Sequence, residues 1–139
     1  MDFDKDKYKK LIKDVKIMNI LLKELKIDDV KLPNKDNEDV QVELTYKCEN
    51  FNSVNDIIEF YPLFNISVLK NKDVFVNIEF TLRAIYEIED LKSYDQVYIA
   101  EFIDRNIPVN VWPYAREIIS SLTTRIGYPA LVIDPFKRS

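Results

Sequence analysis

Two long apolar segments, separated by a short polar turn, restrict the fold of this chain more than any other feature. Residues 57–69 read IIEFYPLFNISVL, and residues 74–89 alternate apolar and polar side chains with a period of two. Such alternation is typical of a strand with one buried and one solvated face. The four-residue turn at 70–73 predicts an antiparallel hairpin. Pro62 indicates a bulge, a kink or an edge position, because proline lacks the donor that a sheet ladder needs.

The first third of the chain predicts a helix and a further strand. Apolar residues recur at heptad-like spacing from Tyr8, which predicts a helix from Asp4 to about Lys16. Residues 17–32 also contain apolar pairs at strand spacing, so helix and strand both remain open there. A polar linker at 32–39 precedes the alternating segment 39–48, which predicts a strand.

The last third predicts two helices. Residues 94–105 carry an aromatic stripe at helical spacing. In the next helix Asn110 suits the N-cap, which places Pro113 in the first turn, where its missing N–H costs little. This helix must end before Pro129. Gly127, the only glycine of the chain, lies where a left-handed residue commonly closes a helix, so a C-cap explains it without a ligand.

The composition excludes several classes of protein. A chain of 139 residues fits one domain, and its absence of histidine removes the usual general base and the catalytic triads. Cys48 is a lone cysteine, and one glycine cannot build a phosphate-binding loop. A net charge of −4 disfavours nucleic acid as a partner. No apolar run reaches the about 20 residues of a membrane span, and the start lacks a signal peptide. We therefore expect a cytoplasmic protein that is no enzyme, binds no metal or cofactor and does not insert into a membrane.

The segment 111–136, VWPYAREIISSLTTRIGYPALVIDPF, carries a family resemblance. An aromatic-Pro-Tyr-Ala-Arg-Glu run opens a helix, an Arg and a Gly end it, and a short apolar stretch closes on a proline and an aromatic residue. This pattern resembles the C-terminal signature of the SecB export-chaperone family. The matching residues are Trp112, Pro113, Tyr114, Ala115, Arg116, Glu117, Arg125, Gly127, Tyr128, Pro129, Leu131, Ile133, Pro135 and Phe136.

The resemblance implies an α+β fold, with a four-stranded antiparallel sheet and C-terminal helices packed on one face. By this analogy residues 17–27 form the first strand. Residues 1–16 then become an added N-terminal helical extension, and residues 17–139 form the SecB-like domain.

The resemblance also implies a function without catalysis. It implies an ATP-independent holdase, assembled as a dimer or as a homotetrameric dimer of dimers, that binds non-native polypeptides in apolar grooves and delivers them to the SecA motor. Aromatic side chains suit such grooves, because they gain free energy from burial without recognising a sequence. The candidates for client binding are Phe60, Tyr61, Phe64, Tyr86, Tyr94, Tyr98, Phe102 and Trp112. The candidates for the oligomer interface are Ile118, Ile119 and Leu122.

Several departures predict a divergent member. Typical members continue into another helix and an acidic tail, whereas this sequence stops at Ser139. Glu79 matches one acid of the family's SecA-docking surface, but Lys31 stands where the companion acid is expected, and Arg83 with Ala84 replaces a glycine pair. SecA therefore stays open as a partner. Two alternatives remain: a chaperone dedicated to one client, such as an antitoxin, and an adaptor or assembly protein that binds one folded partner.

Overall fold

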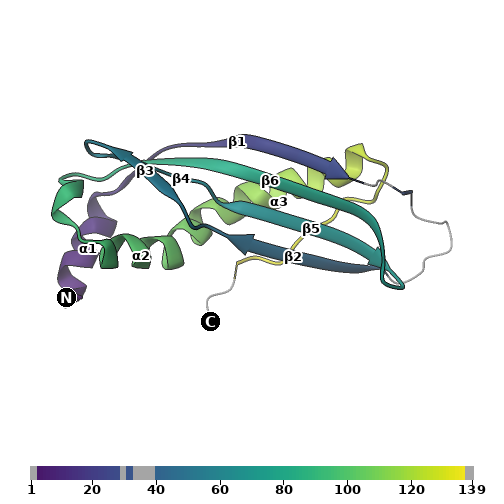
Figure 1. Ribbon diagram of the computed structural model, residues 1–139, viewed down its shortest axis with the longest axis horizontal. Coiled ribbons are helices and arrows are strands. Elements are labelled where there is room, and N and C mark those ends of the chain that lie inside the picture. The colour runs from purple at the N-terminus through teal and green to yellow at the C-terminus, as the bar shows by residue number, and fades with distance from the viewer. Residues whose placement is uncertain (1–2, 29–30, 33–39, 137–139) are drawn as a thin grey trace.

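The computed structural model describes residues 3–28, 31–32 and 40–136. These residues form an antiparallel sheet with helices on one of its faces (Figure 1). The elements in chain order are α1 (Lys5–Asp14), β1 (Lys16–Asp28), β2 (Gln41–Lys47), β3 (Phe51–Val54), β4 (Ile57–Phe60), β5 (Leu63–Lys70), β6 (Asp73–Glu87), the 3-10 turn η1 (Leu91–Ser93), α2 (Gln96–Arg105) and α3 (Ile107–Arg125).

The long strand β6 organises the sheet. It pairs with β1 along one edge and with β5 and then β4 along the other. The outer strand β2 pairs with β5, and β3 pairs with β4. Pro62 separates β4 from β5, and its carbonyl accepts a hydrogen bond of 2.9 Å from the Leu82 N–H. The antiparallel α+β class is confirmed. The expected four strands become six, because residues 57–69 form two strands on either side of Pro62 and because β3 was not predicted.

The predicted hairpin is confirmed between β5 and β6. Its register pairs Lys70 with Asp73. The two residues between them, Asn71 and Lys72, have φ angles of 51° and 69°. Positive φ at both central positions defines the tight turn whose twist matches that of the flanking strands, and asparagine adopts it readily.

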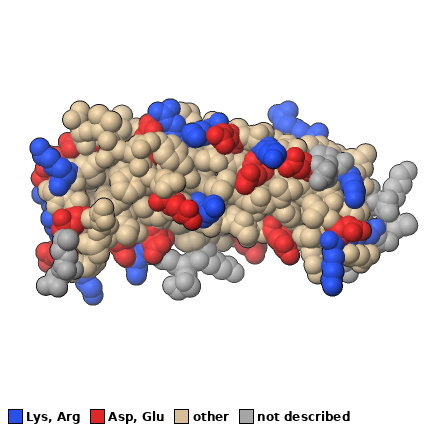
Figure 2. Space-filling model, in the orientation of Figure 1, with Lys and Arg blue, Asp and Glu red and all other residues tan. Residues whose placement is uncertain are grey.

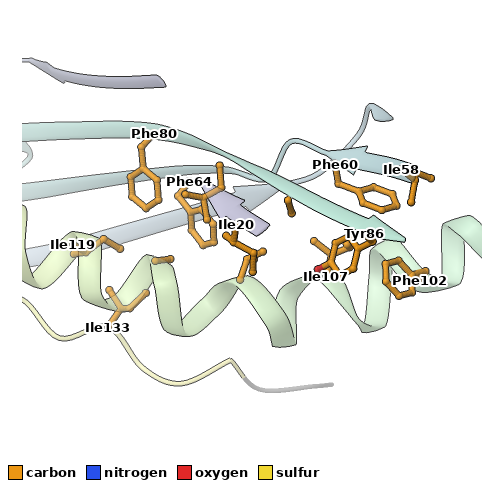
Figure 3. Packing of buried hydrophobic residues seen from close by; sticks show 14 of the residues in the cluster. Ile20, Ile58, Phe60, Phe64, Phe80, Tyr86, Phe102, Ile107, Ile119 and Ile133 are labelled. Atoms are coloured by element: carbon orange, nitrogen blue, oxygen red, sulfur yellow. The ribbon is translucent and has the colours of Figure 1, made fainter. Parts of the chain in front are cut away.

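The two faces of β6 differ as the alternation predicts. Val76, Ile78 and Phe80 on one face are each at most 1% exposed, and Figure 3 shows the Phe80 ring pointing toward α3. The opposite face carries Asn77 and Glu79, which are half-buried. Figure 2 shows this sheet side, where acidic and basic groups are scattered among uncharged residues. The helices therefore cover one face of the sheet and leave the other to solvent.

The N-terminal helix is confirmed, and it belongs to the same core as the sheet. Asp4 caps α1, because its carboxylate accepts from the N–H groups of Asp6 and Lys7 at 2.9 and 3.4 Å. Leu11 is fully buried within the core cluster. The next residues form β1, the strand that the family resemblance implies and that the residues alone left open.

The long C-terminal helix begins earlier than predicted. It starts at Ile107, directly after Asn106, and Pro108 occupies its first turn. Asn110 is thus not the N-cap. It lies inside the helix and donates a hydrogen bond of 3.0 Å to the Tyr86 hydroxyl. Pro113, expected in the first turn, is an interior residue. Pro108 satisfies the same preference, since a first-turn N–H has no acceptor within the helix.

Gly127 ends this helix as predicted. Its φ of +95° lies in the left-handed region. The Gly127 N–H donates to the Thr124 carbonyl at 3.2 Å, and the Tyr128 N–H donates to the Thr123 carbonyl at 2.9 Å. This pair of bonds defines a Schellman C-cap. No described helix combines the length and the apolar character that crossing a membrane requires.

Candidate functional site

After Gly127 the chain turns back along α3, and side chains of that helix hold it in place. We call residues 129–136 the return segment. The Arg116 Nε donates to the Ile133 carbonyl at 3.0 Å, and the Trp112 Nε1 donates to the Asp134 carbonyl at 2.7 Å. Further along, the Thr123 hydroxyl accepts from the Leu131 N–H at 2.9 Å. Three side chains of α3 thus hold the return segment against the helix.

The ring of Trp112 joins this segment to the sheet. Its centroid lies 5.7 Å from that of Tyr46 on β2 and 5.3 Å from that of Phe64 on β5. On its other side the ring of Phe136 lies at 5.3 Å. One side chain therefore links two strands, α3 and the return segment.

A groove opens between β2 and the return segment. Its volume is about 540 Å³, and we call it the Trp112 groove. It is lined by Val42, Leu44, Trp112, Leu131, Val132, Ile133, Asp134, Pro135 and Phe136. A smaller hollow of about 140 Å³ lies at the same tryptophan and is lined by Val109, Trp112, Pro113, Arg116, Pro135 and Phe136.

The groove offers apolar surface beside a free strand edge. Val42 is 39% exposed and Val132 is 65% exposed, although both are aliphatic. Among the described residues β2 pairs only with β5, so its outer backbone groups face away from the sheet. Such an edge can accept an extended chain through main-chain hydrogen bonds, while neighbouring pockets take alternate side chains.

Three titratable groups at and around Tyr46, which packs on the Trp112 ring, are neutral because they are buried. Burial, more than the nearby Cys48, raises the pKa of the Tyr46 hydroxyl, and this buried hydroxyl has no hydrogen-bond partner in the described chain. Burial also raises the pKa of the Cys48 thiol to about 11. It raises the pKa of Tyr86 to about 12, against the opposing hydrogen bond from Asn110. None of these three groups is therefore an activated nucleophile.

Most of the aromatic residues predicted to bind clients lie elsewhere. The structure places six of them in the core of the single chain, each at most 9% exposed: Phe60, Phe64, Tyr86, Tyr94, Tyr98 and Phe102. A buried ring at strand or helix spacing has the same periodicity as a groove-lining ring, so the pattern did not separate the two roles. None of these six residues lines the Trp112 groove. Trp112 itself is half-buried and lines it.

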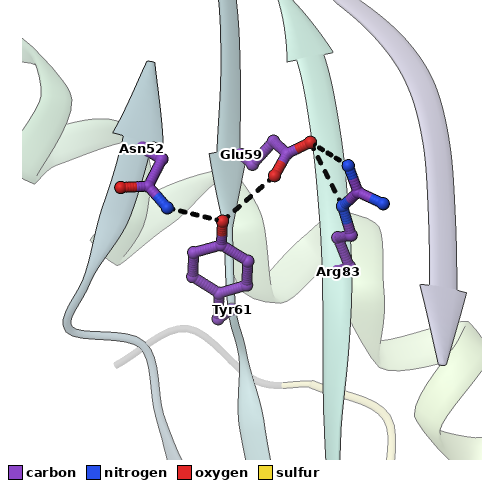
Figure 4. Close-up of polar contacts among 4 residues, drawn as sticks. All are labelled: Asn52, Glu59, Tyr61 and Arg83. Atoms are coloured by element: carbon purple, nitrogen blue, oxygen red, sulfur yellow. Dashed lines mark hydrogen bonds and ion pairs between the residues drawn. The ribbon is translucent and has the colours of Figure 1, made fainter. Parts of the chain in front are cut away.

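Tyr61 lies on the polar face of the sheet, within a network of hydrogen bonds (Figure 4). Its hydroxyl accepts from the Asn52 amide at 2.9 Å and donates to the Glu59 carboxylate at 3.0 Å. The Arg83 Nε donates to the same carboxylate at 3.1 Å. The hydrogen bond from Arg83 is the main cause that lowers the pKa of Glu59. The network ties β3 and β4 to β6, and Tyr61 does not line the Trp112 groove.

The remaining predicted residues divide between surface and core. Glu79 lies on the polar face, with Lys26 and Asn65 as its cross-strand neighbours. Ile119 is fully buried. The other two residues predicted at an oligomer interface, Ile118 and Leu122, are half-buried on α3.

The aliphatic residues of the groove were not singled out from the sequence. Val42 and Leu44 were recognised as one face of a strand, and Leu131 to Phe136 as part of the signature. The missing information was the path of the return segment, because only that path brings the two sets together. An edge strand and an apolar stretch later in the chain indicate a groove only when the fold shows that the two lie side by side.

The chain is a small α+β protein, in which helices cover one face of an antiparallel sheet and an apolar groove lies between an edge strand and the returning C-terminal segment. The sequence profile of the SecB family, described as preprotein translocase subunit SecB, matches residues 9–137. The chain therefore belongs to the SecB family.

Individual relatives agree with this assignment. The protein-export proteins SecB of Wolbachia sp. subsp. Drosophila simulans (strain wRi) and of Wolbachia pipientis wMel are each 35% identical over 51 residues, which is 37% of this chain. The matched part spans 30% of the length of each Wolbachia protein. In structure, the chain resembles the Mycobacterium tuberculosis Rv1957 SecB-like chaperone, solved in complex with a ChAD peptide from the Rv1956 HigA1 antitoxin. The TM-score is 0.78 at 15% identity, covering 91% of this chain and 93% of the other.

Proposed function

We propose that this protein is an ATP-independent chaperone of the holdase type, which binds non-native polypeptides in the Trp112 groove in the cytoplasm. The observation that carries the proposal is the exposed apolar lining of the groove beside the free edge of β2. A non-native chain exposes apolar side chains and unpaired backbone groups. The groove complements both, because it buries the side chains and its strand edge pairs with the backbone.

Membership of the SecB family supports this proposal, since the family profile covers most of the chain. Binding by burial needs no nucleotide and no ionised nucleophile, and burial keeps the Tyr46 hydroxyl and the Cys48 thiol neutral.

The test is suppression of aggregation. At equimolar or lower concentration the protein should suppress the aggregation of a refolding model protein, measured by light scattering. Val42→Ser with Val132→Ser should weaken the suppression, because both side chains line the groove. Val54→Ser is the matched control, since this valine is 72% exposed on β3 outside the groove. No suppression at several-fold excess, or an equal loss in the control, would contradict the proposal.

We also propose a homo-oligomer that covers the exposed side of β1. Ile17, Leu22 and Leu25 face the helix side of the sheet, opposite buried residues of β6, yet they are 42% to 51% exposed. A long apolar edge strand left uncovered favours uncontrolled association. A second copy of the chain that covers β1 would bury these apolar side chains. Ile118 and Leu122 would be the residues of α3 in this interface. Light scattering should give at least a dimer at micromolar concentration, and Leu22→Lys should shift it toward monomer whereas Val54→Lys does not.

A dedicated chaperone for one partner, such as an antitoxin, is the second candidate. The Rv1957 chaperone, which shares the fold, was solved with a peptide from an antitoxin. Recovery of the protein from its own cells, followed by mass spectrometry of bound polypeptides, separates the candidates. Many unrelated clients indicate a general holdase, one non-native client indicates a dedicated chaperone, and one folded stoichiometric partner indicates an adaptor.

If the protein delivers clients to SecA, we propose that it docks the motor through Glu79 on the polar face of the sheet. Its cross-strand neighbour is Lys26, so the local charge is partly compensated. Binding of purified SecA, measured by calorimetry, should be lost in Glu79→Lys if this face docks the motor. The matched control is Glu43→Lys, an exposed carboxylate on β2.

A further inference from the structure

The smaller hollow beside Trp112 combines an apolar lining with one guanidinium group. Two aromatic rings, two prolines, a valine and an arginine line it: Trp112, Phe136, Pro113, Pro135, Val109 and Arg116. We call it the Arg116 hollow. Its volume of about 140 Å³ is close to that of an apolar protein cavity of about 150 Å³ that binds benzene. The hollow therefore has room for one apolar side chain of the size of a phenyl ring.

Arg116 is the charged group of this hollow, and it has no carboxylate partner among the residues that the structure describes. Its side chain is half-buried, and its Nε donates to the Ile133 carbonyl at 3.0 Å. By contrast, Arg83 and Arg105 each pair with a glutamate. A guanidinium that is partly withdrawn from water without an opposite charge is unfavourable, so an anionic ligand would offset this cost.

These two properties select a carboxylate that stands next to an apolar group. The guanidinium presents N–H donors in a fork that matches the two oxygens of a carboxylate. The Nε of Arg116 is bound to Ile133, and the two Nη groups make no hydrogen bond to the described residues. The last residue of a polypeptide carries a carboxylate and a side chain on the same Cα. Capture of a chain-terminal carboxylate is a recurring mode of peptide recognition.

The Arg116 hollow adjoins the Trp112 groove. Three residues line both: Trp112, Pro135 and Phe136. Val109 and Arg116 line only the hollow, whereas Val42 and Val132 line only the groove. An extended chain that lies in the groove can therefore place its last residue in the hollow.

We propose that the Arg116 hollow binds the C-terminal residue of a client polypeptide. The apolar side chain of that residue occupies the hollow, and its carboxylate accepts hydrogen bonds from the Arg116 guanidinium. Preferred clients end in phenylalanine, leucine or methionine with a free carboxylate. The proposal rests on the proposed chaperone function in the Trp112 groove, and it adds a preference for one end of the client chain.

The test compares two peptides that differ only at the C-terminus. Both carry an N-terminal fluorophore, an alternating valine–threonine stretch and a last phenylalanine, but one ends in a free carboxylate and the other in an amide. In fluorescence anisotropy at neutral pH, the wild type should bind the free acid about 10-fold more tightly, because hydrogen bonds to a charged group are the stronger ones. A third peptide, amidated and with an aspartate beside the phenylalanine, tests an acidic side chain as the ligand and should bind like the amide.

Two variants show whether the hollow makes this distinction. Arg116→Gln should bind the acid and the amide equally. This ratio does not depend on a general loosening of the return segment, because both peptides meet the same protein. Val109→Glu places a carboxylate in the lining of the hollow and should also remove the preference for the acid. Val54→Glu is the matched control and should keep the preference, since this valine is 72% exposed on β3 outside the hollow.

Equal binding of the acid and the amide by the wild type overturns the proposal. A preference for the acid that persists in Arg116→Gln also overturns it, as does equally tight binding of the third peptide, which would make an acidic side chain the ligand. Val132→Ser separates these failures from failure of the chaperone function, because weaker binding of both peptides by this variant places them in the Trp112 groove. If neither peptide binds, the hollow holds no chain end, and suppression of aggregation decides the chaperone function independently.

Discussion

The indole Nε1 of Trp112 donates a hydrogen bond of 2.7 Å to the backbone carbonyl of Asp134. The ring of the same tryptophan packs between Phe64 in the core and Phe136 on the return segment. Trp112 thus couples the wall of the groove to the core. A substitution of Trp112 should therefore change both the mobility of the groove wall and the free energy of unfolding.

Trp112→Phe should loosen the return segment while leaving the fold intact. The change keeps an aromatic ring and removes one hydrogen bond, which costs about 1 kcal/mol of the free energy of unfolding. Urea unfolding measures this cost, and hydrogen exchange of residues 131–136 should become faster. Tyr114→Phe on the same helix is the control, because Tyr114 is 49% exposed. Unchanged exchange in residues 131–136 would show that the indole N–H does not hold the segment.

Gly127→Ala should destabilise the protein by about 1 kcal/mol or more, because a Cβ is unfavourable in the left-handed region. A Cβ at this position would also lie 2.6 Å from the Leu32 Cδ2, although that flexible side chain can move. Gly127→Asn places the same Cβ there but tolerates the backbone better. Urea unfolding should therefore give a higher free energy of unfolding for Gly127→Asn than for Gly127→Ala. If Gly127→Asn were instead the less stable variant, the loss of stability would come from the contact with Leu32 rather than from the backbone conformation.

The sequence predicts best where one local rule determines the answer. The alternation of apolar and polar residues predicted which face of β6 is buried, and the left-handed conformation of a helix C-cap explained Gly127. The start of α3 was placed wrongly because Pro108 and Pro113 both satisfy the same first-turn rule. Local chemistry cannot choose between two prolines that both suit the first turn of a helix.

The groove and the burial of Tyr98 depend on contacts between residues far apart in the sequence. Tyr98 has the helical spacing of a surface stripe, but residues more than 90 positions earlier cover it. Likewise Val42 and Val132 meet only because the return segment runs back along α3. The strand character of β1 came from the family resemblance, since the residues alone allowed a helix.

Acid should weaken the tie between β4 and β6. The Arg83 hydrogen bond lowers the pKa of Glu59 from its ordinary value of 4.5. A carboxylate with a lowered folded-state pKa stabilises the fold above its unfolded-state pKa, and this contribution is lost as pH falls through the folded-state value. Urea midpoints from pH 7 to pH 3 should therefore fall less steeply in Glu59→Gln. Glu79→Gln removes a carboxylate from the same face and should keep the wild-type trend. An unaltered slope in Glu59→Gln would contradict the prediction.

Cys48 should resist alkylation in the folded protein. Burial raises the pKa of its thiol from 9.0 to about 11, so at pH 8 the thiolate fraction is about 100-fold lower than in the unfolded chain. The rate of reaction with iodoacetamide, followed by mass spectrometry with and without urea, should differ by at least this factor. Val54→Cys in a Cys48→Ala background provides an exposed thiol for comparison. Equal rates at the two positions would place Cys48 at an open surface.

Pro113→Ala should stabilise the protein. Proline inside a helix lacks the N–H that would donate to the carbonyl four residues earlier, here that of Val109, and an interior proline costs up to about 3 kcal/mol relative to alanine. Pro108→Ala is the matched change, and it should be near neutral because a first-turn N–H has no acceptor in the helix. Urea unfolding of both variants locates the start of α3. If Pro113→Ala lowered the stability, and by more than Pro108→Ala, the first turn of the helix would lie at Pro113 instead.

Pro113 also lines the smaller hollow at Trp112. A Pro113→Ala variant that is more stable but binds clients more weakly would mean that this proline shapes the site.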